Sequence, residues 1–170
     1  MTSPLPSLDP ALLRRALSMF ATGVLIVTTR SGERVHGMTA NSFTSVSLAP
    51  PLVLVCIDHR ATMKQALLEA GHYGLSILAH EQEHLSRHFS SRKGAGVDVE
   101  FEDLEGIPVV KHALAQFSCR ITQAPDAGDH LIFVGEVTGY RHGEGQPLLF
   151  FGGGYKQLHS ASEAGLQPSA

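Results

Sequence analysis

The sequence predicts a mainly β fold, an antiparallel barrel with peripheral helices, built as one domain. Three observations predict it. Strand patterns outnumber helical patterns along the 170 residues, short turns join many of the strands, and the helical stretches interrupt the strands rather than alternating with them. The third observation disfavours a doubly wound α/β fold, in which helices and strands alternate. We therefore expect a closed antiparallel barrel of about six or seven strands.

The N-terminal quarter predicts a helix followed by a β-hairpin. Asp9 reads as an N-cap before Pro10, and apolar residues then recur at one-face helical spacing until Gly23, where we expect the helix to end. A β-branched run at 24–29 and a short strand at 34–39 are separated by a glycine turn. This pattern is typical of two antiparallel strands.

The next segment predicts a bend, a buried strand and a second helix. The apolar alternation slips near Asn41, which indicates a bulge or tight turn. The continuous apolar run at 52–57 predicts a strand buried on both faces. Thr62 and Gln65 fit a capping box, so a helix is expected to begin at or near Thr62 and to stop at Gly71.

The rest of the chain adds mostly strands. The whole chain, 1–170, is expected to be one domain with its core at about 12–158 and a disordered tail at 159–170. The further strands are expected at 73–77, 113–122, 130–140 and 147–151, with a short helix at 81–89 and a polar loop at 90–96.

Composition narrows the possible classes of function. A formal net charge of −3 excludes a strongly basic nucleic-acid binder. Charged residues make up only 17% of the chain, against about 25% in ordinary soluble domains, which favours a further face buried in a homo-oligomer. The sequence shows no signal or membrane segment and has two cysteines without disulfide or zinc spacing. We expect a cytoplasmic protein that binds neither nucleic acid nor membrane.

Absent motifs narrow the chemistry further. The Gly94-Ala-Gly96 segment lacks the third glycine of a dinucleotide fingerprint, and the sequence has neither a phosphate-loop lysine nor a nucleophile elbow. Any nucleotide must therefore be bound in another way. His84 and His88 have the i, i+4 spacing of metal ligands, but no third ligand is evident, so we expect no metal site.

The hydroxyl-rich segment from Thr39 to Ser47 is the first candidate binding element. Backbone amides and short side chains allow the close approach of a planar ligand rimmed with heteroatoms, and Thr39, Asn41, Ser42 and Ser47 could supply them. The other interpretation is a polar outer face of a strand.

Two further segments have the chemistry of a binding site. The start of the helix at Thr62 offers free amides to an anion, and Arg92 and Lys93 could reach the same anion from a loop. His130 begins a strand and could donate to a ligand carbonyl, while Tyr155 follows three glycines and could stack on a ligand. Each also has a plain structural interpretation: a capped helix, solvated cations, a turn histidine and an aromatic anchor.

Taken in order, five segments resemble the short-chain flavin reductase family, the reductase components of two-component flavin-dependent monooxygenases. That family has the FMN-binding split-barrel fold. The match covers about 12–158. The segments are G-M-T-A-N-S-F-T-S-V-S-L-A-P-P-L-V-L-V at 37–55, Y-G-L-S-I-L at 73–78, G-D-H at 128–130, V-G-E-V at 134–137 and F-G-G-G-Y at 151–155.

The resemblance implies a homodimer with the flavin near the subunit interface. It implies that the isoalloxazine is lined by 39–42, that the phosphate meets the start of the second helix, and that the nicotinamide lies beside a histidine. The implied site residues are Thr39, Ala40, Asn41 and Ser42 at the ring, Ser47 and Leu48 at the ring or ribityl chain, Ala61 and Thr62 at the phosphate, Phe89, Arg92 and Lys93 near the flavin tail, and His130 and Tyr155 at the nicotinamide, with His130 as the catalytic residue.

The expected activity is therefore NAD(P)H-dependent reduction of FAD or FMN, with hydride passing from the nicotinamide to the flavin and the reduced flavin passing to a separate oxygenase. Such a reaction needs two rings held together and no strong general base. Two alternatives remain open: a split-barrel oxidase that retains FMN, and a non-catalytic flavin or haem sensor. The sequence does not choose between FAD and FMN, or between NADH and NADPH.

Overall fold

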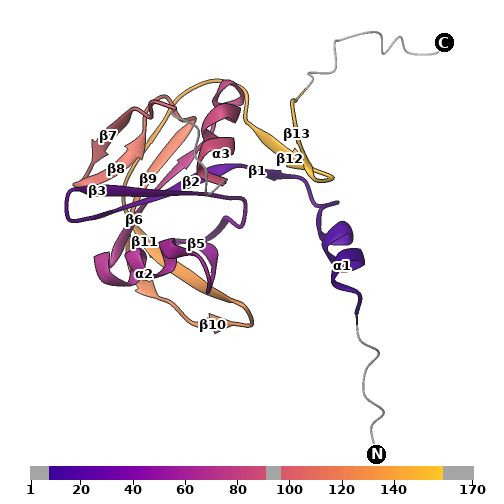
Figure 1. The fold of residues 1–170 in the computed structure, drawn as a ribbon. Coiled ribbons are helices and arrows are strands. Elements are labelled where there is room, and N and C mark those ends of the chain that lie inside the picture. The colour runs from indigo at the N-terminus through magenta and orange to yellow at the C-terminus, as the bar shows by residue number, and fades with distance from the viewer. Residues whose placement is uncertain (1–7, 91–96, 159–170) are drawn as a thin grey trace, which may run out of the picture.

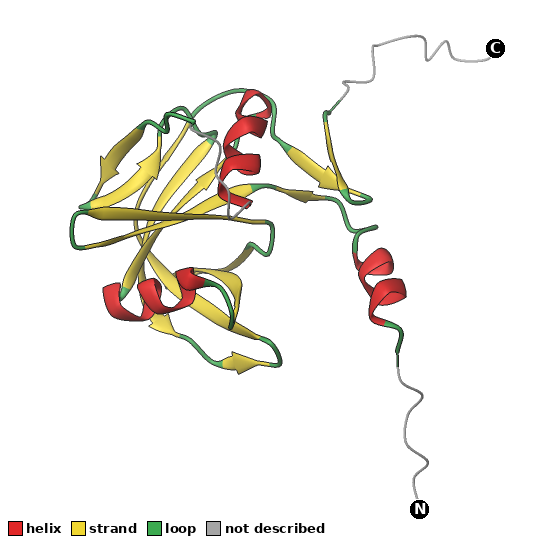
Figure 2. Cartoon of the chain, viewed as in Figure 1, coloured by secondary structure: helices red, strands yellow, loops and turns green. Residues whose placement is uncertain are grey.

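The computed structural model describes residues 8–90 and 97–158, which form a mainly antiparallel β structure with helices on its outside (Figures 1 and 2). The largest sheet has eight strands, seven of them in the order β3-β2-β6-β9-β11-β5-β4, with β10 paired to β11. The mainly β, antiparallel class is therefore confirmed. These strands are β2 (Leu25–Ser31), β3 (Arg34–Ala40), β4 (Thr44–Leu48), β5 (Pro51–Asp58), β6 (His72–Ile77), β9 (Ala115–Gln123), β10 (Asp126–Ala127) and β11 (His130–His142).

The closed ring of strand pairing that we expected is not present. The order begins at β3 and ends at β4, and no ladder joins these two edges within the described ranges. Residues 41–43 connect the two edges directly, because the chain leaves β3 at Ala40 and enters β4 at Thr44. The predicted break near Asn41 therefore lies where the sheet is split.

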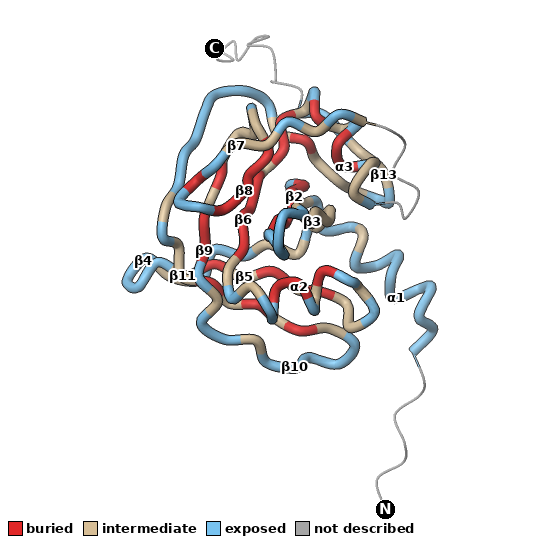
Figure 3. The backbone as a smooth tube through the Cα atoms, turned by 60° about the vertical axis from the view of Figure 1, so that its left-hand side comes forward, coloured by how far each residue is buried: buried red, intermediate tan, exposed pale blue. Residues whose placement is uncertain are grey.

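The core lies on both sides of β2, because successive residues of a strand face opposite ways. Leu25 and Val27 belong to one apolar cluster, and Val24 and Ile26 belong to the other. Strand β5 behaves differently from our expectation of burial on both faces. Its residues 53, 55 and 57 are buried, while the alternate ones are only half-buried (Figure 3). That prediction was wrong, since only one face of β5 turns toward the first cluster.

Tyr73 lies fully buried between the sheet faces and explains one of the motif glycines. Its hydroxyl donates weakly, at 3.5 Å, toward the carbonyls of Val53 and Phe133, and burial raises its pKa. A Cβ at Gly135 would lie 2.7 Å from Tyr73 Cζ and 2.9 Å from Cys119 Cβ. Glycine in the V-G-E-V segment therefore makes room for this ring.

The first helix is shorter than predicted. In α1 (Pro10–Leu17) the carboxylate of Asp9 accepts from the amide of Ala11 at 2.8 Å, so the N-cap is confirmed. The helix ends at Leu17, six residues before the expected glycine stop. None of its residues is buried, and it stands off the main body (Figure 1). A small sheet of β1 (Thr22–Gly23), β12 (Leu149–Phe151) and β13 (Gly154–Lys156) packs Phe150 and Tyr155 against the apolar cluster that contains Val24 and Ile26.

The second helix begins where the sequence predicts, but its capping differs. In α2 (Thr62–Ala70) the N-cap is Ala61, which has no side-chain acceptor, so the predicted capping box is not formed. Gly71 ends α2 in the left-handed conformation at φ 72°, as expected. The predicted helix at 81–89 is a 3₁₀ turn, η1 (His80–Gln82), followed by α3 (Glu83–Ser90).

The hairpin of β7 (Phe101–Leu104) and β8 (Ile107–Val110) was not predicted from the sequence. The two strands pair through a two-residue turn at Glu105 and Gly106. Both turn residues have positive φ, 53° and 81°, as a type I′ turn requires. In the described part of the chain, no helix is long and apolar enough to span a membrane.

Candidate active site

Two cavities lie along β3 and share Ser90 of α3. The large cavity, of about 930 Å³, lies among β3, the end of β5 and the start of α2. The small cavity, of about 190 Å³, lies farther along β3. The large cavity is lined by His36, Gly37, Met38, Asp58, Arg60, Ala61, Thr62, Met63, Phe89 and Ser90, and the small one by Val24, Thr39, Ala40, Asn41, Ser86, Ser90, Phe150 and Tyr155.

The large cavity has a fixed cation at the start of α2. Arg60 donates through Nε to Asp58 Oδ1 at 3.0 Å and through Nη2 to Asp58 Oδ2 at 2.6 Å. These bonds hold the pKa of the Asp58 carboxyl far below its usual range. Because Ala61 offers no capping side chain, the first amides of α2 stay available to an anion. Ala61 and Thr62 therefore lie where an anionic group could bind.

Phe89 forms one wall of the large cavity and depends on Gly37. A Cβ at Gly37 would lie 2.6 Å from Cδ1 and 3.0 Å from Cζ of the Phe89 ring. The ring also contacts His88 edge-on, with centroids 4.7 Å apart. The glycine in the G-M-T-A-N-S segment thus lets an aromatic ring lie directly on the β3 backbone.

The small cavity is closed by Tyr155, which α3 holds from two sides. The Tyr155 hydroxyl shares a hydrogen bond of 2.7 Å with Ser86 Oγ, and the Arg87 guanidinium lies 4.8 Å from the ring centroid. Thr39 Oγ1 donates to the Ser86 carbonyl at 2.7 Å. Phe150 meets the Tyr155 ring edge-on at 5.6 Å between centroids.

The hydroxyl-rich segment uses most of its side chains internally. Ser42 Oγ accepts from the amide of Cys56 at 3.0 Å and donates to its carbonyl at 3.1 Å, which ties the connection between β3 and β4 to β5. Asn41 Nδ2 donates to Thr22 Oγ1 at 3.2 Å. Thr39, Ala40 and Asn41 line the small cavity, whereas Ser42 lines neither cavity.

His130 lies beside the large cavity rather than beside Tyr155. It is paired across the sheet with Asp58, and its Nδ1 donates to Asp129 Oδ1 at 2.7 Å, which lowers the pKa of the Asp129 carboxyl. His130 is not among the residues that line either cavity. One chain therefore does not bring His130 and Tyr155 to the same cavity.

Ser47 and Leu48, two other expected site residues, lie away from both cavities. Ser47 Oγ accepts from the Ala49 amide at 3.2 Å, Leu48 is 94% exposed, and neither lines one of the two cavities. Arg92 and Lys93 lie outside the described residues.

Two residues that line the cavities, Arg60 and Ser86, were not among the predicted site residues. The Asp-x-Arg spacing just before α2 could have indicated Arg60. The i, i+3 spacing of Ser86 and Phe89, which puts them on one face of a helix, could have indicated Ser86. Within the described ranges, no group of three or more histidine, cysteine, aspartate or glutamate residues could hold a metal ion.

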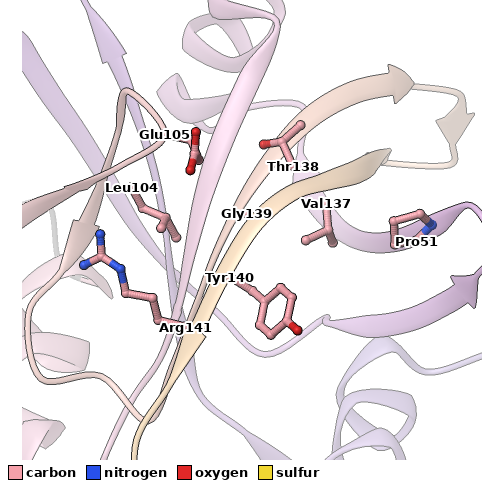
Figure 4. A pocket seen from close by; sticks show the side chains of 8 residues that line it. All are labelled: Pro51, Leu104, Glu105, Val137, Thr138, Gly139, Tyr140 and Arg141. Atoms are coloured by element: carbon pink, nitrogen blue, oxygen red, sulfur yellow. The ribbon is translucent and has the colours of Figure 1, made fainter.

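A third cavity, of about 430 Å³, contains none of the predicted site residues (Figure 4). It lies between the C-terminal half of β11 and the β7–β8 turn. Its Arg141 is paired, as Arg60 is, and donates to Glu102 at 2.8 Å and to the Asp103 carbonyl at 2.9 Å. The two cavities on β3 differ from it in having the uncapped start of α2 and the rings of Phe89 and Tyr155, which favour them as the cofactor site.

The sequence profile of the family described as "Flavin reductase like domain" matches residues 17–159. This chain belongs to the flavin reductase family. An NADH-dependent flavin reductase from Rhodococcus sp is 46% identical over 156 residues, covering 90% of this chain and 89% of the relative. The reductase component of 4-hydroxyphenylacetate 3-monooxygenase from Thermus thermophilus is 42% identical over 146 residues, covering 85% of this chain and 94% of that protein.

Solved structures of the flavin reductase family have the same fold. Flavin reductase PheA2 in its native state superposes with a TM-score of 0.87 at 48% identity, covering 89% of this chain and 99% of that chain. The NADH:FAD oxidoreductase SgcE6 of Streptomyces globisporus C-1027, in complex with NAD and FAD fragments, superposes with a TM-score of 0.85 at 37% identity, covering 94% of this chain and 100% of that chain. The split β-barrel of flavin reductases is thus the fold of this chain.

Proposed function

We propose that this protein is an NAD(P)H-dependent flavin reductase that supplies reduced FAD or FMN to a separate monooxygenase component. The observation that carries the proposal is the pair of cavities along β3. One has a fixed cation and free helix amides, the other is walled by aromatic rings, and they share Ser90. A phosphate-bearing cofactor and a second ring can therefore meet on one strand. The relatives named as reductases and reductase components support the same activity.

The residues present fit a flavin. The large cavity has the volume of a cofactor site, about 930 Å³, and one end of it has the guanidinium of Arg60, oriented by Asp58, and the first amides of α2 at Ala61 and Thr62. Phe89 offers a ring face, and Thr39, Ala40 and Asn41 continue the site into the small cavity. When bound, the flavin supplies the two-electron chemistry by accepting hydride from the reduced nicotinamide.

The protein itself has to bind, orient and exclude water. Asp58 fixes Arg60 for a phosphate, Phe89 and Tyr155 bound the ring positions, and the backbone at 39–41 offers amides to ring heteroatoms. We propose the small cavity, beside Tyr155, for the approach of the nicotinamide ring. His130 lies on the large-cavity side of the same chain, at the rim beside Asp58, so its proposed role in orienting the nicotinamide falls to the His130 of the second subunit of the proposed dimer. Hydride transfer between the two rings needs no strong base to remove a proton. The hydroxyl, amide and guanidinium groups that line the two cavities are therefore sufficient for this chemistry.

Steady-state kinetics of the purified protein, with NADH and NADPH each crossed against riboflavin, FMN and FAD, tests the proposal. We expect nicotinamide oxidation that depends on added flavin. A protein that stays yellow through dialysis and turns over added flavin poorly would support an FMN-retaining oxidase instead. A Soret band in the absence of turnover would support a haem sensor.

His130→Ala tests the role of the histidine. We expect a higher KM for the nicotinamide or slower reduction at saturation, with an unchanged circular dichroism spectrum. His59→Ala is the matched control, because the His59 ring also lies next to a carboxylate, with Nε2 at 3.3 Å from Asp126 Oδ1. An unchanged kcat/KM in His130→Ala would remove this residue from the site.

We also propose a homodimer that acts in the cytoplasm, where reduced nicotinamide is available. The support comes from α1, an eight-residue helix with no buried residue, in which Leu12 is 65% and Leu17 is 67% exposed. A helix this short is marginal in water unless its apolar side packs against something. The small share of charged residues fits the same conclusion.

Light scattering after gel filtration tests the dimer. We expect twice the chain mass for the wild type and a shift toward monomer for Leu17→Glu. Leu68→Glu, on an exposed position of α2, is the matched control. A monomeric wild type would overturn the dimer and leave the proposed activity standing.

A further inference from the structure

Tyr155 is held in place by residues that are distant in the sequence. Its hydroxyl is bonded to Ser86, which is fully buried, and its ring lies under the Arg87 guanidinium. Both contacts come from α3, whereas Tyr155 itself belongs to β13. One aromatic ring is therefore fixed by a separate element of the fold.

The backbone that carries Tyr155 has little rigidity of its own. It follows Gly152 and Gly153, at φ 59° and 82°, and Gly154. Strand β13 has three residues and pairs only with β12, which is equally short. Glycines give the chain many accessible conformations, so the ring position depends on contacts made by the side chain.

Ser86 links two sides of the small cavity. Its hydroxyl holds Tyr155, and its carbonyl accepts from Thr39 Oγ1 at 2.7 Å. Thr39 and Tyr155 both line the small cavity, where the proposed function places the approach of the nicotinamide to the flavin. Ser86 of α3 thus sets the distance between Thr39 of β3 and Tyr155 of β13, which line the same cavity.

We propose that Ser86 is a positioning residue of the reductase, which fixes Tyr155 through its hydroxyl so that the small cavity is shaped for the reduced nicotinamide, with Arg87 holding the ring from its other side. This inference rests on the proposed function and adds to it a residue that acts through another. Without the hydrogen bond between the Ser86 and Tyr155 hydroxyls, the Tyr155 ring can move together with the glycine-rich β12–β13 hairpin. The nicotinamide then has to order the ring as it binds.

The test is a double-mutant cycle with Ser86→Ala and Tyr155→Phe, because both changes remove the same hydrogen bond. We expect each single variant to raise the KM for NADH about threefold to tenfold, with the flavin Kd from fluorescence quenching unchanged. The double variant should resemble either single variant, since the bond is already lost. Tyr155→Phe keeps the ring and its packing, so it remains informative even where Ser86→Ala folds poorly.

Ser118→Ala is the matched control. Ser118 is also buried and shares a hydroxyl–hydroxyl bond, at 2.9 Å with Thr138, but it lines neither cavity on β3. We expect a similar loss of thermal stability with an unchanged KM for NADH.

Three results would overturn the inference: an unchanged KM in Tyr155→Phe, additive effects in the double variant, or an equal KM rise in Ser118→Ala. Additive effects would mean that the Tyr155 hydroxyl acts on the ligand independently of Ser86. All three presuppose a wild-type protein that oxidises NADH with added flavin. Failure of the wild type itself would count against the proposed function and against this inference together.

Discussion

Replacing Gly37 by alanine should disturb the flavin end of the site more than the fold. The added Cβ would lie 2.6 Å from Phe89 Cδ1 and closer still to Cε1. Carbon atoms in contact normally lie about 3.5–4.0 Å apart, so the ring has to move by about 1 Å or more. It can do so only by turning into the large cavity or by displacing α3.

The magnitude follows from what surrounds the ring. Overpacking a filled core costs about 1–3 kcal/mol. Phe89 is only half-buried and has the cavity on one side, so the loss of unfolding free energy should lie near the lower end of that range. Flavin affinity should fall by about fivefold, which corresponds to about 1 kcal/mol, because a ring displaced by about 1 Å occupies ligand space.

Flavin titration by fluorescence quenching and urea denaturation measure the two effects. Gly23→Ala is the matched control, since a Cβ there meets nothing within 4 Å. Adding Phe89→Leu to Gly37→Ala should recover stability, because the smaller side chain leaves room for the methyl group. Equal flavin affinity in the wild type and Gly37→Ala would refute the assignment of Phe89 to the binding cavity.

Three further predictions test the core and the cation. Gly135→Ala should lower the unfolding free energy by about 1–3 kcal/mol, measured with urea against Gly143→Ala, whose Cβ meets nothing within 4 Å; equal stability would contradict the packing described. Burial raises the pKa of the Cys119 thiol to about 12, so in a Cys56→Ser variant, which removes the half-buried second thiol, Cys119 should react with a thiol reagent at about pH 8 only after unfolding; fast labelling of this native variant would contradict the burial of Cys119. The lowered pKa of Asp58 means that its pairing with Arg60 stabilises the fold above the ordinary carboxyl pKa of about 4 and is lost as the pH falls below it; the stability difference between wild type and Asp58→Asn should shrink on acidification, and a constant difference down to about pH 2 would contradict this.

Much of the fold could be predicted because local patterns and tertiary packing agree in most segments. The N-cap at Asp9 and the glycine stop at Gly71 are local devices, and both were predicted correctly. The capping box at Thr62 was wrong because the helix begins one residue earlier than that box requires, with Ala61 and not Thr62 in the N-cap position. Such a one-residue difference depends on the path of residues 59–61 between the end of β5 and the start of α2, which no short motif encodes.

Burial and long-range pairing were harder to predict. The apolar run of β5 indicates a strand but does not say which neighbours cover its second face. The β7–β8 hairpin carried a signal in the Glu105–Gly106 pair, since a two-residue loop ending in glycine suits a type I′ turn. In the site, the expectation that hydroxyl groups would face the ligand did not anticipate that Ser42 Oγ donates to the Cys56 carbonyl and accepts from the Cys56 amide.

The internal use of these hydroxyl groups has a consequence for how the site can recognise a flavin. Since Thr39 and Ser42 are already bonded to Ser86 and Cys56, ring recognition falls to main-chain groups and to the aromatic walls. Main-chain amides and ring faces select a planar heterocycle without distinguishing what is attached beyond the first phosphate. In the proposed site, Arg60 likewise faces a phosphate that FMN and FAD have in common. A reductase built in this way is suited to a flavin that enters, is reduced and leaves, and its choice between the two flavins has to come from contacts beyond the phosphate.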